Sequence, residues 1–158
     1  MANEMKIEHI NPFLTAASSV FSNMFGIQLS AGKPYVKVTA FETSTLVISF
    51  GVTGQISGQV LIAFSNDVAC DIASKMCMMP IDELNELSLS ALSELGNMIL
   101  GNAATVLSTK SILVDITPPS LIKGDFIIES SFAKNICIPL IYDGNKAIEL
   151  DISLKEDE

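Results

Sequence analysis

The segment SELGNMILGNAATVLS, residues 93–108, combines helical spacing with polar and small residues that a helix built only to fill a core would not need. Glu94 and Asn97 are three residues apart, so in a helix their side chains point the same way. The carboxylate accepts hydrogen bonds, and the carboxamide both accepts and donates them. Gly96 and Gly101 lie close by, although glycine costs ~1 kcal/mol relative to alanine in a helix interior. The pair is therefore the first candidate for a chemically active site.

The helix predicted around this pair, from about Asp82 to Thr109, has two unlike faces. An apolar stripe, expected to bury against a sheet, comprises Leu84, Leu87, Ala91, Leu92, Leu95, Met98, Ile99, Ala103, Val106 and Leu107. A polar or small stripe recurs at i, i+4, i+7 and i+11 and comprises Ser90, Glu94, Asn97, Gly101 and either Ala104 or Thr105. Because Gly101 and Ala104 leave the backbone uncovered, another molecule could come close to this second face.

The other predicted elements must position that helix. A first helix is expected to start at an Asn11 cap with Pro12 at its first position, and to end at Gly26. A short helix capped by Ser65 or Asn66 should end near Met76. The strand candidates, with turns at 53–55 and 143–145, are 35–42, 44–52, 56–64, 112–116, 125–131, 134–142 and 146–154. This order predicts an α+β fold, a mainly antiparallel sheet flanked by helices with one long central helix.

The composition excludes several classes of function. The chain has 158 residues, a formal net charge of −9 at pH 7 and a pI near 4.4, which argues against sequence-independent binding to nucleic acid or anionic membranes. It contains no arginine, and a Ser/His/Asp triad would have to use His9, its only histidine, which we expect at the surface or at a hinge. No set of zinc ligands and no glycine-rich phosphate loop is present, so no metal site is predicted.

The expected location is the cytoplasm. No apolar run reaches the ~18 residues of a membrane span, and the first residues lack the anatomy of a signal peptide. Cys70, Cys77 and Cys137 are odd in number and have no framework spacing, which favours a reducing compartment, with Cys70 and Cys77 as small buried side chains. No linker or repeat requires a second domain, so one domain over residues 1–158 is predicted.

The pattern E-x-x-N is not specific by itself, because Glu8 and Asn11 repeat it. Pro12 follows that pair directly, so we expect the pair at a helix entrance and not on a helical face. It carries no functional prediction.

A wider motif is more specific. Ser90, Glu94 and Asn97 form S-x-x-x-E-x-x-N, followed about twenty residues later by VDITPP at 114–119. This resembles the CheC/CheX/FliY family of bacterial chemotaxis phosphatases, and within it the CheX branch, which has one such helical site where CheC-type members have two. The segments INPFLTAASSVFSNMFG and GVTGQISGQVLIAF and the closing strands follow in the order of a CheX chain. The family proline often lies slightly further from the asparagine than Pro118 or Pro119 does here.

The resemblance implies a reaction. Family members remove the phosphoryl group from the aspartate of a phosphorylated CheY-type response regulator, which itself supplies Mg²⁺ and a lysine. It implies that Asn97 orients the attacking water, that Glu94 pairs with the regulator's lysine, and that Ser90 adds a minor contact. It also implies a homodimer formed by sheet extension, for which the strands after Pro119 are expected to offer unpaired edges. Two alternatives stay open: a non-catalytic dimeric module that binds a two-component response regulator, and a small-molecule sensor.

Overall fold

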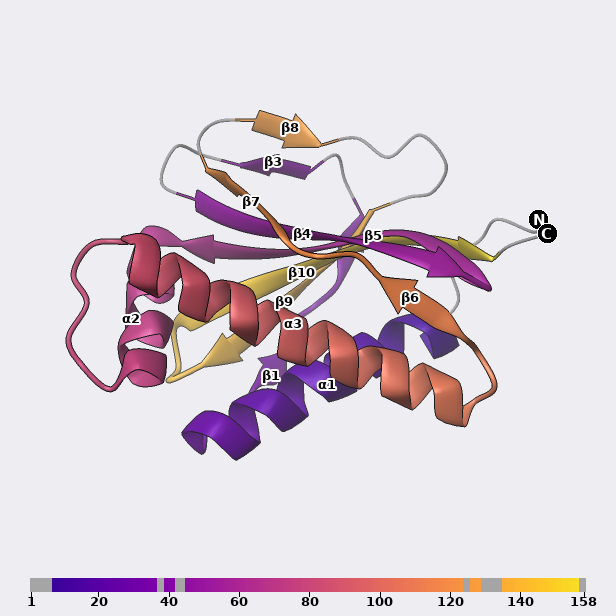
Figure 1. The fold of residues 1–158 in the computed structure, drawn as a ribbon, viewed down its shortest axis with the longest axis horizontal. Coiled ribbons are helices and arrows are strands. Elements are labelled where there is room, and N and C mark those ends of the chain that lie inside the picture. Colours follow the sequence, from indigo (N-terminus) through magenta and orange to yellow (C-terminus); the bar gives the residue numbers. More distant parts are fainter. Residues whose placement is uncertain (1–6, 37–38, 42–44, 124–125, 129–134, 157–158) are drawn as a thin grey trace.

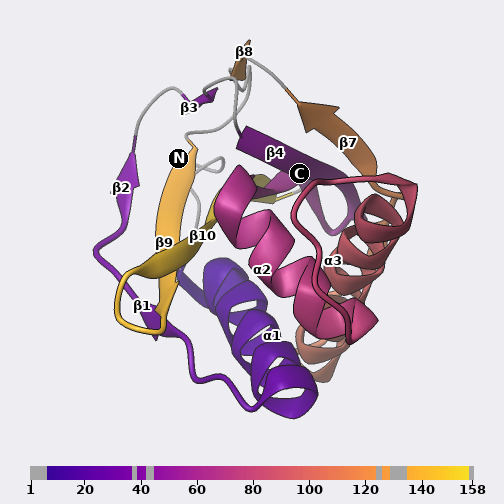
Figure 2. The same ribbon diagram turned by 90° about the vertical axis from the view of Figure 1, so that its left-hand side faces the viewer.

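Three helices cover one face of an antiparallel sheet in the computed structural model, which describes residues 7–36, 39–41, 45–123, 126–128 and 135–156 (Figure 1). The helices are α1 (Ile7–Phe25), α2 (Asn66–Cys77) and α3 (Glu86–Thr109). Figure 2 shows all three on the same side of the sheet. The predicted α+β fold, with an antiparallel sheet and one long helix, is confirmed.

The main sheet has eight strands in the order β1-β9-β10-β5-β4-β6, with β2 also pairing with β9 and β7 also pairing with β4. Its strands are β1 (Ser30–Ala31), β2 (Tyr35–Val36), β4 (Thr45–Gly54), β5 (Ile56–Ser65), β6 (Val114–Ile116), β7 (Ser120–Lys123), β9 (Ile136–Tyr142) and β10 (Lys146–Glu156). A separate pair, β3 (Thr39–Phe41) and β8 (Phe126–Ile128), lies on the far side of this sheet from the helices (Figure 1). The rest of the predicted strands 35–42 and 125–131 lies outside the described residues.

Alternation along the strands divides the sheet into two faces. In β4, Leu46, Ile48, Phe50 and Val52 join the core under the helices, together with alternate residues of β5, β9 and β10. Val47 points the other way and packs in a smaller cluster with Leu61, Ala63 and Ile122. This period of two is the reason the sequence could assign the strands.

The first helix begins earlier than predicted. It starts at Ile7 and contains Pro12, so Asn11 is not its cap. Glu8 and Asn11 therefore both lie on a helix, and the prediction that they sit at a helix entrance is wrong. His9 is 3% exposed, which corrects its expected place at the surface or a hinge. Burial of His9 and Ile10 extends the helix N-terminal to the proline, although proline prefers the first turn.

The second helix matches its prediction closely. Ser65 is the N-cap, and its hydroxyl accepts a hydrogen bond from the Val68 amide at 3.3 Å. The helix ends at Cys77, with Met78 in the left-handed conformation at φ 56°. Capping chemistry was sufficient to predict the start of this helix to within one residue.

The last two long strands do not offer open edges. β10 lies between β5 and β9, and β9 pairs on its other side with β1 and β2. The expectation of unpaired edges along all strands after Pro119 is therefore wrong for β9 and β10. Among the described residues, β7 pairs with β4 alone. The prediction of one domain over residues 1–158 stays a prediction.

By length and hydropathy, none of the helices in the described ranges qualifies as a membrane-spanning segment.

Candidate functional site

The helix α3 carries the predicted site residues, and its start is fixed by a capping box. The Asn85 side chain accepts from the Ser88 amide at 2.9 Å, and the Ser88 hydroxyl accepts from the Asn85 amide at 2.7 Å. The helix therefore has 24 residues and begins at Glu86, four residues later than the predicted start near Asp82. Ser88 is fully buried, so this cap also fixes the rotation of the helix on the sheet.

One side of α3 is packed against the core. The residues buried there are Ser88, Leu92, Leu95, Gly96, Ile99, Leu100, Ala103 and Leu107. Gly96 faces the ring of Phe50, a fully buried side chain of β4. A Cβ placed on Gly96 would lie 2.7 Å from Cζ of that ring, which is closer than real Cβ contacts. The first glycine of the motif is therefore required by close packing of helix and strand.

The opposite side of α3 is open and presents the predicted site residues. Ser90, Glu94, Asn97 and Gly101 are exposed, and Ala104 is half-buried. At ~1.5 Å and ~100° per residue, Glu94 and Asn97 are about 4.5 Å apart along the axis and about 60° apart around it. One approaching surface can therefore touch both. The structure brings the four exposed positions together on one face, as predicted from their spacing.

The second glycine has a different environment from the first. A Cβ on Gly101 would meet nothing within 4 Å. The Thr105 hydroxyl donates to the Gly101 carbonyl at 3.1 Å, which ties down the backbone without covering it. Packing within this chain therefore gives no reason for glycine at position 101, and the uncovered backbone is available to a partner.

The N-terminal end of the same face contains a leucine. Leu87 was expected in the buried stripe, and this prediction is wrong because the side chain is 56% exposed. The inward position of the first turn belongs to Ser88, whose hydroxyl belongs to the capping box. At the start of α3, the buried position is therefore one residue later than the apolar pattern predicts, and Leu87 lies on the same face as the polar site residues.

The VDITPP segment supports the strand beneath α3. Residues 114–116 form β6, which pairs with β4 through Val52 and Ile116. Thr117 then forms two hydrogen bonds with Gly51. Its amide donates to the Gly51 carbonyl at 3.0 Å, and its hydroxyl accepts from the Gly51 amide at 2.7 Å. A Cβ on Gly51 would lie 2.9 Å from the Thr117 methyl. Since Gly51 follows Phe50, the two halves of the sequence motif meet on successive residues of β4.

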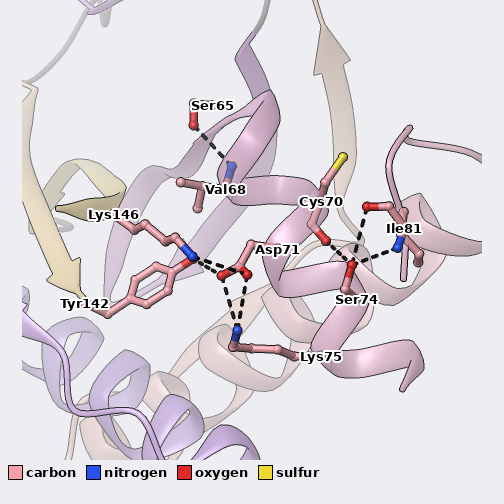
Figure 3. Close-up of polar contacts among 9 residues, drawn as sticks. All are labelled: Ser65, Val68, Cys70, Asp71, Ser74, Lys75, Ile81, Tyr142 and Lys146. Carbon is pink, nitrogen blue, oxygen red and sulfur yellow. Dashed lines mark hydrogen bonds and ion pairs between the residues drawn. The ribbon is translucent and has the colours of Figure 1, made fainter. Parts of the chain in front are cut away.

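A polar cluster ties α2 to the turn between β9 and β10 (Figure 3). Asp71 accepts from the Tyr142 hydroxyl at 2.8 Å and from Lys75 Nζ at 3.2 Å, and Lys146 Nζ lies 3.4 Å away. Burial favours a higher pKa for Asp71, but the hydrogen bonds from Tyr142 and Lys75 and the two lysine charges outweigh it, so the pKa lies below its ordinary value. Burial, and then the Asp71 carboxylate, raise the pKa of Tyr142. Sequence analysis did not predict this cluster, because its members come from elements that are distant in the chain.

A second cluster lies on the sheet face away from the helices. The Cys137 sulfur and one carboxylate oxygen from each of Glu149 and Asp151 lie within 4.8 Å of one another. They meet because the β9–β10 register places Asp151 opposite Cys137. Burial, and then a hydrogen bond donated to Glu149, raise the pKa of the Tyr35 hydroxyl. A thiol and two carboxylates are donors that a divalent cation can accept, but three such groups do not define an ion site. Sequence analysis missed them because their proximity depends on strand register.

Comparison with known families agrees with the sequence motif. Residues 46–140 match the family model of the chemotaxis phosphatase CheX, and this range contains α2, α3 and the VDITPP segment. The CheY-P phosphatase CheX of Thermotoga maritima is 31% identical over 147 residues, which are 92% of this chain and 95% of that protein.

Solved structures share the fold over nearly the whole chain. A CheC-like superfamily protein from Shewanella sp. PV-4 has a TM-score of 0.85 at 26% identity, covering 96% of this chain and 99% of that one. The CheX chain in a CheX–CheY–BeF₃–Mg²⁺ complex from Borrelia burgdorferi has a TM-score of 0.80 at 32% identity, covering 96% and 100%.

Proposed function

The chain belongs to the CheX family of chemotaxis phosphatases, and we propose that its substrate is the phosphoaspartate of a CheY-like response regulator. Membership of this family makes the chain a phosphatase. The observation that supports the proposed substrate is the open face of α3, where Glu94 and Asn97 project together from a helix whose other side is buried. A narrow helical face of this kind suits insertion into the phosphorylation site of another protein.

In the proposed reaction, Asn97 positions water. Its carboxamide oxygen accepts a hydrogen bond from the water, and its NH₂ group donates to a neighbouring acceptor. The water oxygen attacks phosphorus in line with the aspartyl oxygen, the bond between phosphorus and that oxygen breaks, and the products are the aspartate carboxylate and inorganic phosphate. The chain needs no nucleophile of its own, because positioning alone contributes several kcal/mol of barrier lowering.

Glu94 fixes the docking. In this proposal its carboxylate pairs with the regulator's lysine, and Ser90, one turn earlier, adds a minor contact. Mg²⁺ comes with the regulator, in keeping with its presence in the Borrelia burgdorferi complex. Gly101 and the half-buried Ala104 allow the regulator's surface to approach the helix backbone closely.

The proposed assembly is a homodimer that leaves its two α3 faces open to separate regulators. The described edge at β7 is available for sheet extension, whereas β9 and β10 are already paired on both sides. The cytoplasmic location expected from the sequence is part of the same proposal, because the substrate would be found there.

The decisive experiment is Asn97→Ala. We expect the phosphatase rate to fall about 10²-fold or more, a loss of roughly 2.7 kcal/mol of transition-state stabilisation, with binding to the phosphorylated regulator largely kept. The measurement is loss of radiolabel from a panel of response regulators phosphorylated with labelled acetyl phosphate. Because Asn97 is exposed, the change should cost less than about 0.5 kcal/mol of stability, which a melting curve checks.

Asn11→Ala is the matched control. Asn11 is also exposed and also three residues after a glutamate on a helix, but we expect its substitution to change the rate less than about twofold. If folded Asn97→Ala protein keeps wild-type activity, the mechanism is wrong, and the non-catalytic dimeric binding module becomes the better interpretation.

A further inference from the structure

The exposed face of α3 extends one turn beyond the motif and ends in an apolar side chain. Leu87 is 56% exposed, and it is the single large hydrophobic side chain exposed on α3, a helix that the structure describes completely. At ~100° per residue, Leu87, Ser90, Glu94, Asn97 and Gly101 fall within about 80° around the helix axis. Leu87 therefore belongs to the same face as the proposed catalytic residues.

Neither the helix cap nor the core accounts for a leucine at this position. The capping box uses Asn85 and Ser88, and Ser88 takes the buried position of the first turn. A polar residue at position 87 would satisfy the fold equally well, since surface positions of a helix tolerate such changes with little effect on stability. Single exposed leucines are common on protein surfaces, so the observation that singles out Leu87 is its place on the helix face that carries Glu94 and Asn97.

The charges around Leu87 indicate what kind of partner surface fits. Asp82, Glu83, Glu86 and Glu94 are all exposed, and residues 76–109 contain no lysine or arginine. The stretch of chain that surrounds Leu87 therefore carries acidic side chains and no basic one. The complementary surface has an apolar depression bordered by basic side chains.

Resting on the proposed function above, we propose that Leu87 is the apolar anchor by which α3 selects its response regulator. The preferred regulator has an apolar depression bordered by lysine or arginine beside its phosphorylation site. Leu87 and Asn97 are about 15 Å apart along the helix. A standard interface covers about 800 Å² on each partner, roughly 30 Å across, so one regulator can contact both residues.

The test separates docking from chemistry. Leu87→Ala is expected to raise both KM and the Kd for a beryllofluoride-activated regulator about tenfold. The reason is that it removes most of the apolar surface that the Leu87 side chain would bury on docking. The turnover number should change less than twofold, since Leu87 does not touch the reacting atoms. Leu87→Met, which keeps a side chain of similar volume, should restore KM to within about twofold of wild type.

Two further variants define the specificity of the effect. Leu113→Ala changes a leucine that is 65% exposed but lies beyond the other end of α3, so KM should be unchanged. Glu83→Gln should reduce the dependence of KM on salt concentration, because it removes one charge from the rim of the contact. Thermal unfolding and light scattering of every variant show whether fold and assembly are intact.

The outcomes distinguish this inference from the proposed function. If wild-type protein dephosphorylates a regulator and Leu87→Ala has wild-type KM and Kd, the inference is wrong while the proposed function stands. If Leu87→Ala instead changes the mass measured by light scattering, Leu87 serves contact between copies of this chain, and the inference is equally overturned. If wild-type protein neither binds nor dephosphorylates any regulator, both the proposed function and the inference fail.

Discussion

The two glycines of α3 allow stability and docking to be separated by single methyl groups. At Gly101 an added Cβ meets nothing within 4 Å, so Gly101→Ala should gain the full helix-propensity difference of about 0.5–1 kcal/mol. For a chain of this length that corresponds to a rise in Tm of about 1–4 °C. At Gly96 the same methyl would lie 2.7 Å from Phe50 Cζ, in a ring that is fully buried in the core.

Gly96→Ala should therefore lose stability despite the same gain in propensity. Overpacking a core costs about 1–3 kcal/mol; a cost of about 2 kcal/mol, less the gain of about 0.5–1 kcal/mol, leaves a net loss of about 1–1.5 kcal/mol and a fall in Tm of about 2–6 °C. The effects on KM should be the reverse, with the change at Gly101 and not at Gly96. Gly101→Ala places a methyl on the proposed docking face and should raise KM roughly fivefold, equivalent to about 1 kcal/mol of lost affinity. Gly96→Ala should keep KM near wild type wherever the protein remains folded.

The assay pairs thermal unfolding at one fixed protein concentration with steady-state dephosphorylation of one regulator. A fall in Tm for Gly101→Ala would show that this glycine is needed for packing, contrary to its open surroundings. A rise in Tm with unchanged KM would show instead that no partner approaches Gly101, and the docking face would then have to be placed elsewhere on the helix.

Three other expectations can be measured directly. Glu94→Ala should raise KM about tenfold by removing a ground-state ion pair, and steady-state kinetics giving an unchanged KM would exclude the lysine contact. Asp71→Asn should be less stable than wild type at pH 7. Because the folded pKa of Asp71 is lowered, that difference should shrink as pH falls below about 4; urea unfolding between pH 3 and 7 measures it, and a difference independent of pH would contradict the role of the charge. Light scattering at tens of micromolar should give twice the monomer mass, and a monomer would refute the proposed dimer.

Local pattern was enough to predict several features. The period of two in β4 and β5 and the turn residues between β9 and β10 correctly predicted strands and hairpins. Ser65 correctly predicted the start of α2. The spacing of Ser90, Glu94, Asn97 and Gly101 correctly predicted one shared exposed face. Each of these signals depends on residues within a turn or two of one another, where backbone geometry alone fixes side-chain direction.

Sequence analysis was wrong where packing against distant parts of the chain decides which residue is buried or where a helix starts. Leu87 fits an apolar helical pattern as well as its neighbours do, and only the Asn85–Ser88 cap and the packing of the first turn place it outside. Pro12 favours a helix start, yet burial of His9 and Ile10 moves the start one turn earlier. Tertiary packing outweighs a local preference of about 1 kcal/mol or less at Leu87, and at Pro12 it outweighs the penalty of about 3 kcal/mol for a proline inside a helix.

The sequence by itself determined the chemistry of this protein's open helix face, because a carboxylate and a carboxamide three residues apart on a helix must point the same way. The same spacing placed Gly101 on that face, but the sequence could not show which side chain makes glycine necessary at position 96. Only the tertiary structure shows that Gly96 is required by Phe50, 46 residues earlier in the chain, and that Gly101 faces open space. The physical reason is that close packing depends on which strand lies under the helix, and strand pairing is set by contacts far apart in sequence.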